Sequence, residues 1–192
     1  MAVNPIPPPE QRSRVAGAGA IRIVGDPVLA KRADEVEDID AALVALTGEM
    51  LTTMYEAPGL GLAAPQVGVS RRFFVYDVGE GPAVLVNPEI TDTDGEWAYA
   101  EGCLSIPELT FEVIRPKRVH VTGRDLDGNE VSIEADELLA RLFQHELDHL
   151  DGVLFLEHLD DDQSREAKRF VRDLRMRAAR PTPSGTGGLQ LP

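Results

Sequence analysis

Cysteine is almost absent from this chain of 192 residues, in which Cys103 is the only thiol. A single thiol cannot form an intramolecular disulfide, so a secreted fold built on a disulfide framework is excluded. A lone cysteine is most often a small buried residue of the core. A role for Cys103 as a ligand therefore depends on what the rest of the sequence offers.

Long hydrophobic runs and positive charge are also scarce. No apolar stretch approaches the roughly 20 residues that span a membrane, and residues 1–19 lack the apolar core of a signal peptide. The formal charge is -14, which argues against a protein that binds nucleic acid with its whole surface. We therefore expect a cytoplasmic protein with no membrane partner and no DNA partner.

The composition predicts one folded domain between two loose ends. A hydrophobic fraction of 43% and a charged fraction of 27% are typical of a soluble globular protein. Residues 1–19 are rich in proline, glycine and alanine, and we expect a flexible N-terminal extension there. Residues 20–180 are the predicted domain, which starts with a short ordered segment and a turn at 25–27. Residues 181–192 are expected to form a flexible tail.

Two helical patterns flank a region of short strands. Residues 39–57 carry leucine and methionine at helical spacing, and Asp38 or Asp40 can cap the start. Asp127, Gly128 and Asn129 predict a hairpin turn. We expect antiparallel strands curled around a later helix that starts near 135–136 and ends at Gly152. The β-prone stretches, separated by turn residues, are 73–76, 83–86, 97–100, 118–121 and 131–133.

The most informative stretch reads QHELDHLDG, residues 144–152. His145 and His149 are four residues apart, so on a helix both imidazoles lie on one face, one turn apart, where one metal ion can bind both. Glu146 can reach water on the metal without binding the metal itself. Such a short match also arises by chance. However, the apolar residues before it predict a buried helix, in which these side chains need partners.

The histidine pair changes the interpretation of Cys103. A thiolate and two imidazoles supply three ligands and leave a fourth tetrahedral position open for water, which is the pattern of a catalytic site. These ligands suit zinc, iron or cobalt. One alternative is another metallohydrolase, such as a peptidase, whose third ligand comes from later in the chain, where His158 is the only histidine. The other is a binding module with a structural metal, which would fill all four positions with protein.

The glycine-rich stretch GLGLAAPQVG, residues 59–68, contains G-x-G-x-x-A and could indicate a dinucleotide-binding turn. That turn needs a strand before it and a helix after it. Here a helix precedes the stretch, and Pro65 lies where the next helix would begin. We expect a tight loop that brings backbone close to a ligand, with Gln66 as a placed polar group; a plain glycine turn is the alternative.

A last amphipathic helix is expected at about 161–179, and it is basic. Residues 163–180 hold seven basic and two acidic residues, a net charge of +5 on an acidic chain. The pattern fits either a solvated helix face or docking to a polyanion such as RNA, which suggests the ribosome as a partner. The basic residues are Arg165, Lys168, Arg169, Arg172, Arg175, Arg177 and Arg180.

Three motifs taken together resemble the bacterial type of the peptide deformylase family. They are GLGLAAPQ at 59–66, EGCLS at 101–105 and QHELDH at 144–149, and with IRIVGDPVL near the start the resemblance covers about residues 21–159. The resemblance implies an α+β fold, with antiparallel β-sheets packed around a central H-E-x-x-H helix and a C-terminal helix. It implies a hydrolase that acts on a linear amide, removing the formyl group from the N-terminal formyl-methionine of newly synthesised polypeptides and releasing formate.

The resemblance also implies a metal centre. Cys103, His145 and His149 would be the ligands, with ferrous iron the most typical ion and zinc, nickel or cobalt also accepted. Glu146 would be the acid and base of the reaction. Gln66 would help to hold the formyl oxygen.

The resemblance extends to the residues around the substrate. The backbone N–H of Leu104 would also hold the formyl oxygen, and Glu101 would pair with Arg115. Arg141, one turn before His145, lies where an apolar residue beside the methionine pocket is expected. The residues that would lie along the peptide are Leu60, Gly61 and Gly102.

Overall fold

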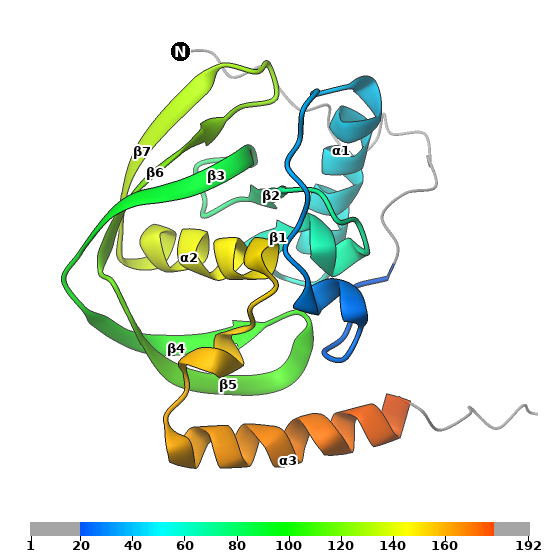
Figure 1. Cartoon of the computed structure of the whole chain (residues 1–192), viewed down its shortest axis with the longest axis vertical. Helices are drawn as coiled ribbons and strands as arrows, with labels where there is room; N and C mark the ends of the chain where they lie inside the picture. Colours follow the sequence, from blue (N-terminus) through cyan, green and yellow to red (C-terminus); the bar gives the residue numbers. More distant parts are fainter. Residues whose placement is uncertain (1–19, 179–192) are drawn as a thin grey trace, which may run out of the picture.

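The computed structural model describes residues 20–178 (Figure 1). The predicted extension at 1–19 and the predicted tail at 181–192 lie outside the described residues. Within the described part of the chain, no helix is long and apolar enough to cross a membrane. The elements, in chain order, are η2 (Pro27–Ala30), α1 (Ala41–Glu56), β1 (Gly61–Ala63), η3 (Ala64–Val67), β2 (Phe73–Tyr76), β3 (Ala83–Asp94), β4 (Trp97–Cys103), β5 (Ile106–Arg115), β6 (Arg118–Arg124), β7 (Glu130–Asp136), α2 (Glu137–Asp151), η4 (Phe155–His158) and α3 (Asp161–Ala178).

The strands form two antiparallel sheets, as predicted. One sheet has five strands in the order β1-β2-β3-β6-β7, and β4 pairs with β5 in a separate sheet. The hairpin between β6 and β7 contains the predicted turn, where Gly128 has a φ of 82°. In Figure 1, α2 lies between the five-stranded sheet and the β4–β5 pair. The fold is therefore α+β, and α2 faces both sheets.

Helix α1 covers one face of the large sheet. Asp40, and not Asp38, caps the helix, since its Oδ1 accepts a hydrogen bond from the Leu43 N–H at 2.8 Å. Leu43 and Met54 are fully buried in a cluster that also contains Phe73 of β2. The predicted helix and its role in the core are confirmed.

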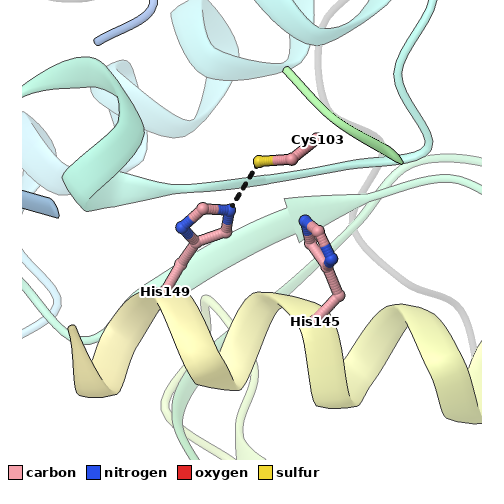
Figure 2. Close-up of side chains that lie close together, drawn as sticks. All are labelled: Cys103, His145 and His149. Atoms are coloured by element: carbon pink, nitrogen blue, oxygen red, sulfur yellow. Dashed lines mark hydrogen bonds between the residues drawn. The ribbon is translucent and has the colours of Figure 1, made fainter. Parts of the chain in front are cut away.

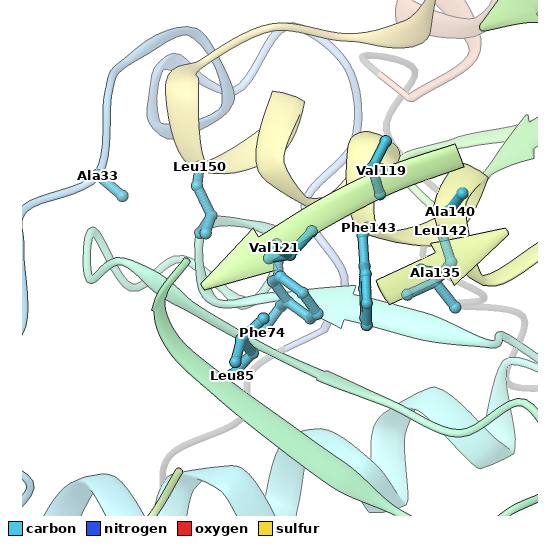
Figure 3. Packing of buried hydrophobic residues seen from close by; sticks show 11 residues of the cluster. Ala33, Phe74, Leu85, Val119, Val121, Ala135, Ala140, Leu142, Phe143 and Leu150 are labelled. Carbon is cyan, nitrogen blue, oxygen red and sulfur yellow. The ribbon is translucent and has the colours of Figure 1, made fainter. Parts of the chain in front are cut away.

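Helix α2 packs on the opposite face of the same sheet. Phe143 is fully buried, and its ring lies 5.9 Å from the ring of Phe74 and 5.1 Å from that of Tyr76. Figure 3 shows Phe143 and Phe74 among the other buried hydrophobic residues of this cluster. The helix ends at Gly152, which adopts a left-handed conformation with a φ of 75°. The predicted end of the helix is confirmed. The aromatic contacts set the distance between α2 and the sheet.

The structure corrects two expectations. Strand β5 (Ile106–Arg115) was not predicted, because Pro107 and Glu108 interrupt its apolar pattern near the start. The stretch predicted as one tight loop contains strand β1 and the 3-10 helix η3 instead. Strand β1 exists because β2 pairs with it, with Gly61 opposite Tyr76 and Ala63 opposite Phe74. Three residues carry too little local pattern to reveal such a strand.

The predicted basic helix is present as α3. Asp160 caps it through Oδ1, which accepts from the Gln163 N–H at 2.9 Å, while Gln163 Oε1 accepts from the Asp160 N–H at 3.2 Å. Such a reciprocal pair satisfies two backbone donors at the helix start. Ala167 is buried beside Phe155 in a cluster that also includes Cys103. Helix α3 is therefore packed against the rest of the domain through its apolar side.

The end of α2 gives a test of this packing. A Cβ added to Gly152 would lie 2.7 Å from backbone atoms of Lys31, whereas one added to Gly128 would meet no atom within 4 Å. Both glycines have a positive φ, so Gly128→Ala measures the conformational cost alone, about 1–2 kcal/mol. Gly152→Ala should cost roughly 1–3 kcal/mol more in unfolding free energy because of the clash. Equal losses in urea unfolding would contradict this packing.

Candidate metal centre

Three potential ligands from two elements meet at one point. Cys103 ends β4, and His145 and His149 lie one turn apart on α2. Their ligand atoms all lie within 4.8 Å of one another. Cys103 Sγ is 3.1 Å from His149 Nε2. Figure 2 shows the thiol and the two imidazoles directed toward one another. The hairpin that carries the thiol passes beside the helix that carries the imidazoles, and this brings together residues that are far apart in the sequence.

His158 is not part of this group. Its Nε2 lies 2.8 Å from Asp148 Oδ2 and 3.5 Å from Arg115 Nη1. His158 therefore belongs to a polar cluster with Asp148 and Arg115. A peptidase-like ligand set that includes His158 is not supported by this geometry.

The surroundings of Cys103 favour its thiolate form. Burial alone raises the pKa of the thiol, but the neighbouring His149 and His145 outweigh burial, and the pKa lies well below its usual range. The Ser105 N–H also points to Sγ at 3.4 Å. Since the thiolate is the form that binds metal ions, this environment suits a ligand better than an inert core cysteine.

Glu101 orients His145. Its Oε1 lies 2.7 Å from His145 Nδ1, which leaves Nε2 of the ring for the metal side. Arg115 donates two hydrogen bonds to Glu101, at 2.7 and 2.8 Å, so the predicted Glu101–Arg115 pair is confirmed. Burial would raise the pKa of Glu101, but the hydrogen bonds from Arg115 and His145 hold it well below its ordinary value. Glu101 is therefore an ionised carboxylate inside the protein.

Glu146 is buried beside the same centre. Its side chain is 4% exposed, and burial raises its pKa to about 7. Among the described residues, none gives its Oε2 a hydrogen-bond partner. A Cβ on Gly61 would lie 2.9 Å from the Glu146 Cδ, so only glycine leaves room for the carboxylate at this place. A buried carboxylate with a free oxygen next to metal ligands is positioned to handle protons.

Gln66 is held with its amide directed at the thiol. Its Oε1 accepts from the Ala63 N–H at 2.8 Å, and its Nε2 donates to Ser105 Oγ at 3.2 Å. Nε2 also lies 3.8 Å from Cys103 Sγ. The side chain is 1% exposed. Both ends of the amide are thus fixed, and Nε2 lies on the side of Cys103.

A cavity of about 760 Å³ opens over the centre. His149 does not line it and is only 1% exposed, so this ligand is buried behind the cavity wall. The cavity has the size of a pocket for a small molecule or the end of a peptide. Every other residue predicted for the site lines the cavity, namely Leu60, Gly61, Gln66, Gly102, Cys103, Leu104, His145 and Glu146.

The positive charge of Arg141 in the cavity wall is paired with Glu101. Its Nη1 donates to Glu101 Oε2 at 2.8 Å, and its Nη2 donates to the carbonyl oxygens of Trp97 and Val113 at 2.7 and 3.0 Å. Its guanidinium also lies over the Trp97 ring, 5.2 Å from the centroid. Arg141 therefore clamps α2 to both strands of the β4–β5 pair while its side chain forms part of the wall.

At the far end of the cavity, beside the first turns of α2, the sequence interpretation singled out only Arg141. This end is also lined by Leu138 and Leu142 of α2 and by Tyr99 of β4, which it missed. The signal was available, because positions 138, 141, 142 and 145 have the i, i+3, i+4, i+7 spacing of one helix face. The contribution of Tyr99 could not be found in the same way, because it depends on how β4 approaches α2.

The donor set fits a catalytic transition metal. A thiolate and two imidazoles supply three ligands, one imidazole is oriented by a carboxylate, and the remaining side faces the cavity. A structural site would need a fourth protein ligand, and none joins the group among residues 20–178.

Comparison with known proteins agrees with this chemistry. A family model described as polypeptide deformylase matches residues 19–165. The chain is 54% identical over 137 residues to the peptide deformylase of Clostridium botulinum (strain Alaska E43 / Type E3), which covers 71% of this chain and 93% of that protein. It is 47% identical over 153 residues to the peptide deformylase of Acidothermus cellulolyticus, which covers 80% of this chain and 85% of the relative.

Solved structures resemble the fold over nearly their whole length. The crystal structure of a peptide deformylase from Legionella pneumophila has a TM-score of 0.79 and 39% identity, and covers 86% of this chain and 100% of that chain. The peptide deformylase from Thermotoga maritima has a TM-score of 0.71 and 48% identity, and covers 73% and 96% respectively.

Proposed function

The chain belongs to the polypeptide deformylase family, and from that premise we propose how its own residues carry out the family's reaction. It is a hydrolase that removes the formyl group from the N-terminal formyl-methionine of new polypeptides, leaving formate and a free amino terminus. Residues 20–180 form the catalytic domain in this proposal, with α2 as its central helix. The observation that carries the proposal is the meeting of Cys103 with the two histidines beside the buried Glu146.

The family is metal-dependent, and Cys103, His145 and His149 would hold one divalent ion. Ferrous iron is our choice for the native metal, with zinc, nickel or cobalt as substitutes, because a soft thiolate and imidazoles suit these ions. When bound there, such an ion would supply Lewis-acid chemistry, polarising the formyl group and making water easier to deprotonate. Glu101 would keep His145 in the orientation that binding needs.

Glu146 would move the proton. From its buried position beside the proposed metal ligands, it would accept a proton from the attacking water and return it to the amine nitrogen as the C–N bond breaks. Gly61 would leave the space that this carboxylate requires.

Two donors would stabilise the negative charge that develops on the formyl oxygen. One is Nε2 of Gln66, and the other is the N–H of Leu104, the first residue of the two-residue turn between β4 and β5. Loss of one such donor typically costs roughly 2.7–4 kcal/mol of barrier. Leu60, Gly61 and Gly102 would lie along the peptide backbone.

The methionine side chain would enter the far end of the cavity. Leu138 and Leu142 supply apolar surface there, and the Tyr99 ring supplies a face suited to a thioether sulfur. Arg141 would close this end with the stem of its side chain, because its charged head is already engaged by Glu101.

The role of Glu146 can be separated from metal binding. Glu146→Gln keeps the size of the side chain but cannot accept a proton, so formate release from formyl-Met-Ala-Ser should fall by about 10²–10⁴-fold. Metal content, measured on protein purified without oxygen, should stay at the wild-type level. Turnover at the wild-type rate would show that another group moves the proton.

The ligand set can be tested with two substitutions. Cys103→Ala removes a proposed ligand, and the purified protein should lose most of its metal. His158→Ala serves as the control, because it removes a histidine that lies outside the group, and metal content should not change. The opposite result would favour a peptidase-like site that uses the later histidine.

We also propose that α3 docks on the ribosome, where new chains emerge in the cytoplasm. The support is charge and exposure, because Lys168, Arg169 and Arg172 lie on its exposed side while Ala167 is buried. Phosphate backbones attract such a surface, and the attraction weakens with salt.

Co-sedimentation with ribosomes tests this docking. Lys168→Gln combined with Arg169→Gln should reduce binding several-fold at low salt, and the difference should shrink as salt is raised. The matched control is Lys31→Gln with Lys117→Gln, which removes two positive charges elsewhere on the surface. Equal losses in both double variants would show that overall charge, and not α3, decides binding.

A further inference from the structure

One charged side chain at the cavity has no assigned role so far. Glu108 of β5 lines the cavity and is exposed at its rim. Its φ is 67°, in the left-handed region that a residue with a side chain rarely adopts. Strain of this kind persists only where the surrounding structure imposes it, and it is frequent at sites that bind ligands.

The strain comes from a bulge next to the metal centre. Gly102 pairs with Thr110, but the next residue of β4, Cys103, pairs with Ile106. Strand β5 therefore holds three residues, 107–109, that have no partner on β4. A bulge changes the direction in which side chains leave the strand, and bulges are common beside active sites. Here the bulge places Glu108 on the cavity rim within the same hairpin that carries Cys103.

The charges around the cavity leave Glu108 uncompensated. Glu101 and Arg141 also line the cavity, but each is buried and bound to the other. Glu146 is buried at the centre itself. Within the described part of the chain, the Glu108 carboxylate forms no hydrogen bond and no ion pair. The rim of the cavity thus carries a free negative charge that water can reach.

We propose that Glu108 is a specificity-determining residue, which favours substrates with lysine or arginine at one of the two positions after the formyl-methionine. The inference rests on the proposed placement of the formyl group beside Cys103. From there the peptide must leave through the open cavity, and residues 107–110 line its path. The cation that fits this rim belongs to the substrate, since Arg141, the basic side chain of the cavity wall, is already bound to Glu101.

The size of the effect follows from exposure. An ion pair in contact with water changes an affinity by no more than about fivefold, and repulsion of an acidic side chain adds to the difference. The preference should therefore be a difference of roughly five- to tenfold in kcat/KM between a lysine and a glutamate peptide at low salt. It should act mainly through KM, because the rim lies away from the reacting bond. It should weaken in 0.5 M salt, where the Debye length falls to about 4–5 Å.

The experiment measures formate release from matched peptides. Formyl-Met-Ala-Lys-Ser, formyl-Met-Ala-Gln-Ser and formyl-Met-Ala-Glu-Ser vary the third residue, and a parallel set varies the second. Each rate is divided by that of the glutamine peptide. We expect the wild-type enzyme to hydrolyse the lysine peptide faster than the glutamate peptide in at least one set. Glu108→Gln should bring the lysine-to-glutamate ratio of these rates close to one, and Glu108→Arg should bring it below one.

The control is Glu112→Gln, which removes the same charge from the same strand but at an exposed position that does not line the cavity. It should keep the wild-type ratio. If the lysine-to-glutamate ratio is unchanged in Glu108→Gln, or falls equally in Glu112→Gln, this inference is wrong and the proposed function is unaffected. Failure of the wild-type enzyme to hydrolyse even the glutamine peptide would instead overturn the proposed function, and this inference with it.

Discussion

The buried carboxylate of Glu101 is the contact on which the site depends. It receives hydrogen bonds from Arg115 of β5 and from Arg141 of α2, and it holds the ring of His145. One anion thus joins both strands of the small sheet to the helix, at the level of the metal centre. A buried charge is tolerated only when it is paired and hydrogen-bonded, and here each oxygen has partners. Because Cys103 is two residues along the same strand, the contact that orients an imidazole also sets the position of the thiol.

Helix α2 can hold the ligands of the site in fixed positions because its two sides have different surroundings. Phe143 lies against aromatic rings of the large sheet, which fixes the helix firmly. The side with His145 and Leu142 faces the cavity instead. A rigid helix is a better base for a metal site than a loop, since a small displacement of a ligand costs affinity and rate. The β5 bulge beside the centre holds Glu108, whose φ is 67°.

The sequence reveals those parts of the site that are local in the chain. His145, Glu146 and His149 share a helix, so their spacing alone predicts their geometry, and Gly152 marks where that helix ends. Cys103 could be joined to them only through the chemistry of a ligand set and the family resemblance. Strand β5 stayed hidden because Pro107 and Glu108 break its pattern, and β1 stayed hidden because it depends on pairing with β2. The three acceptors of Arg141 could not be foreseen either, since they come from residues that only the tertiary fold brings near.

The distance in sequence between the thiol and the imidazoles has a thermodynamic consequence. The segments that carry them meet only after the β4–β5 hairpin has docked on α2, so an unfolded chain cannot present the complete set of ligands. An ion that binds the folded form preferentially must shift the folding equilibrium, by about 2.7 kcal/mol when its free concentration is 100 times its Kd. The supply of metal in the cell would then regulate how long the protein survives proteolysis, and not only how fast it turns over.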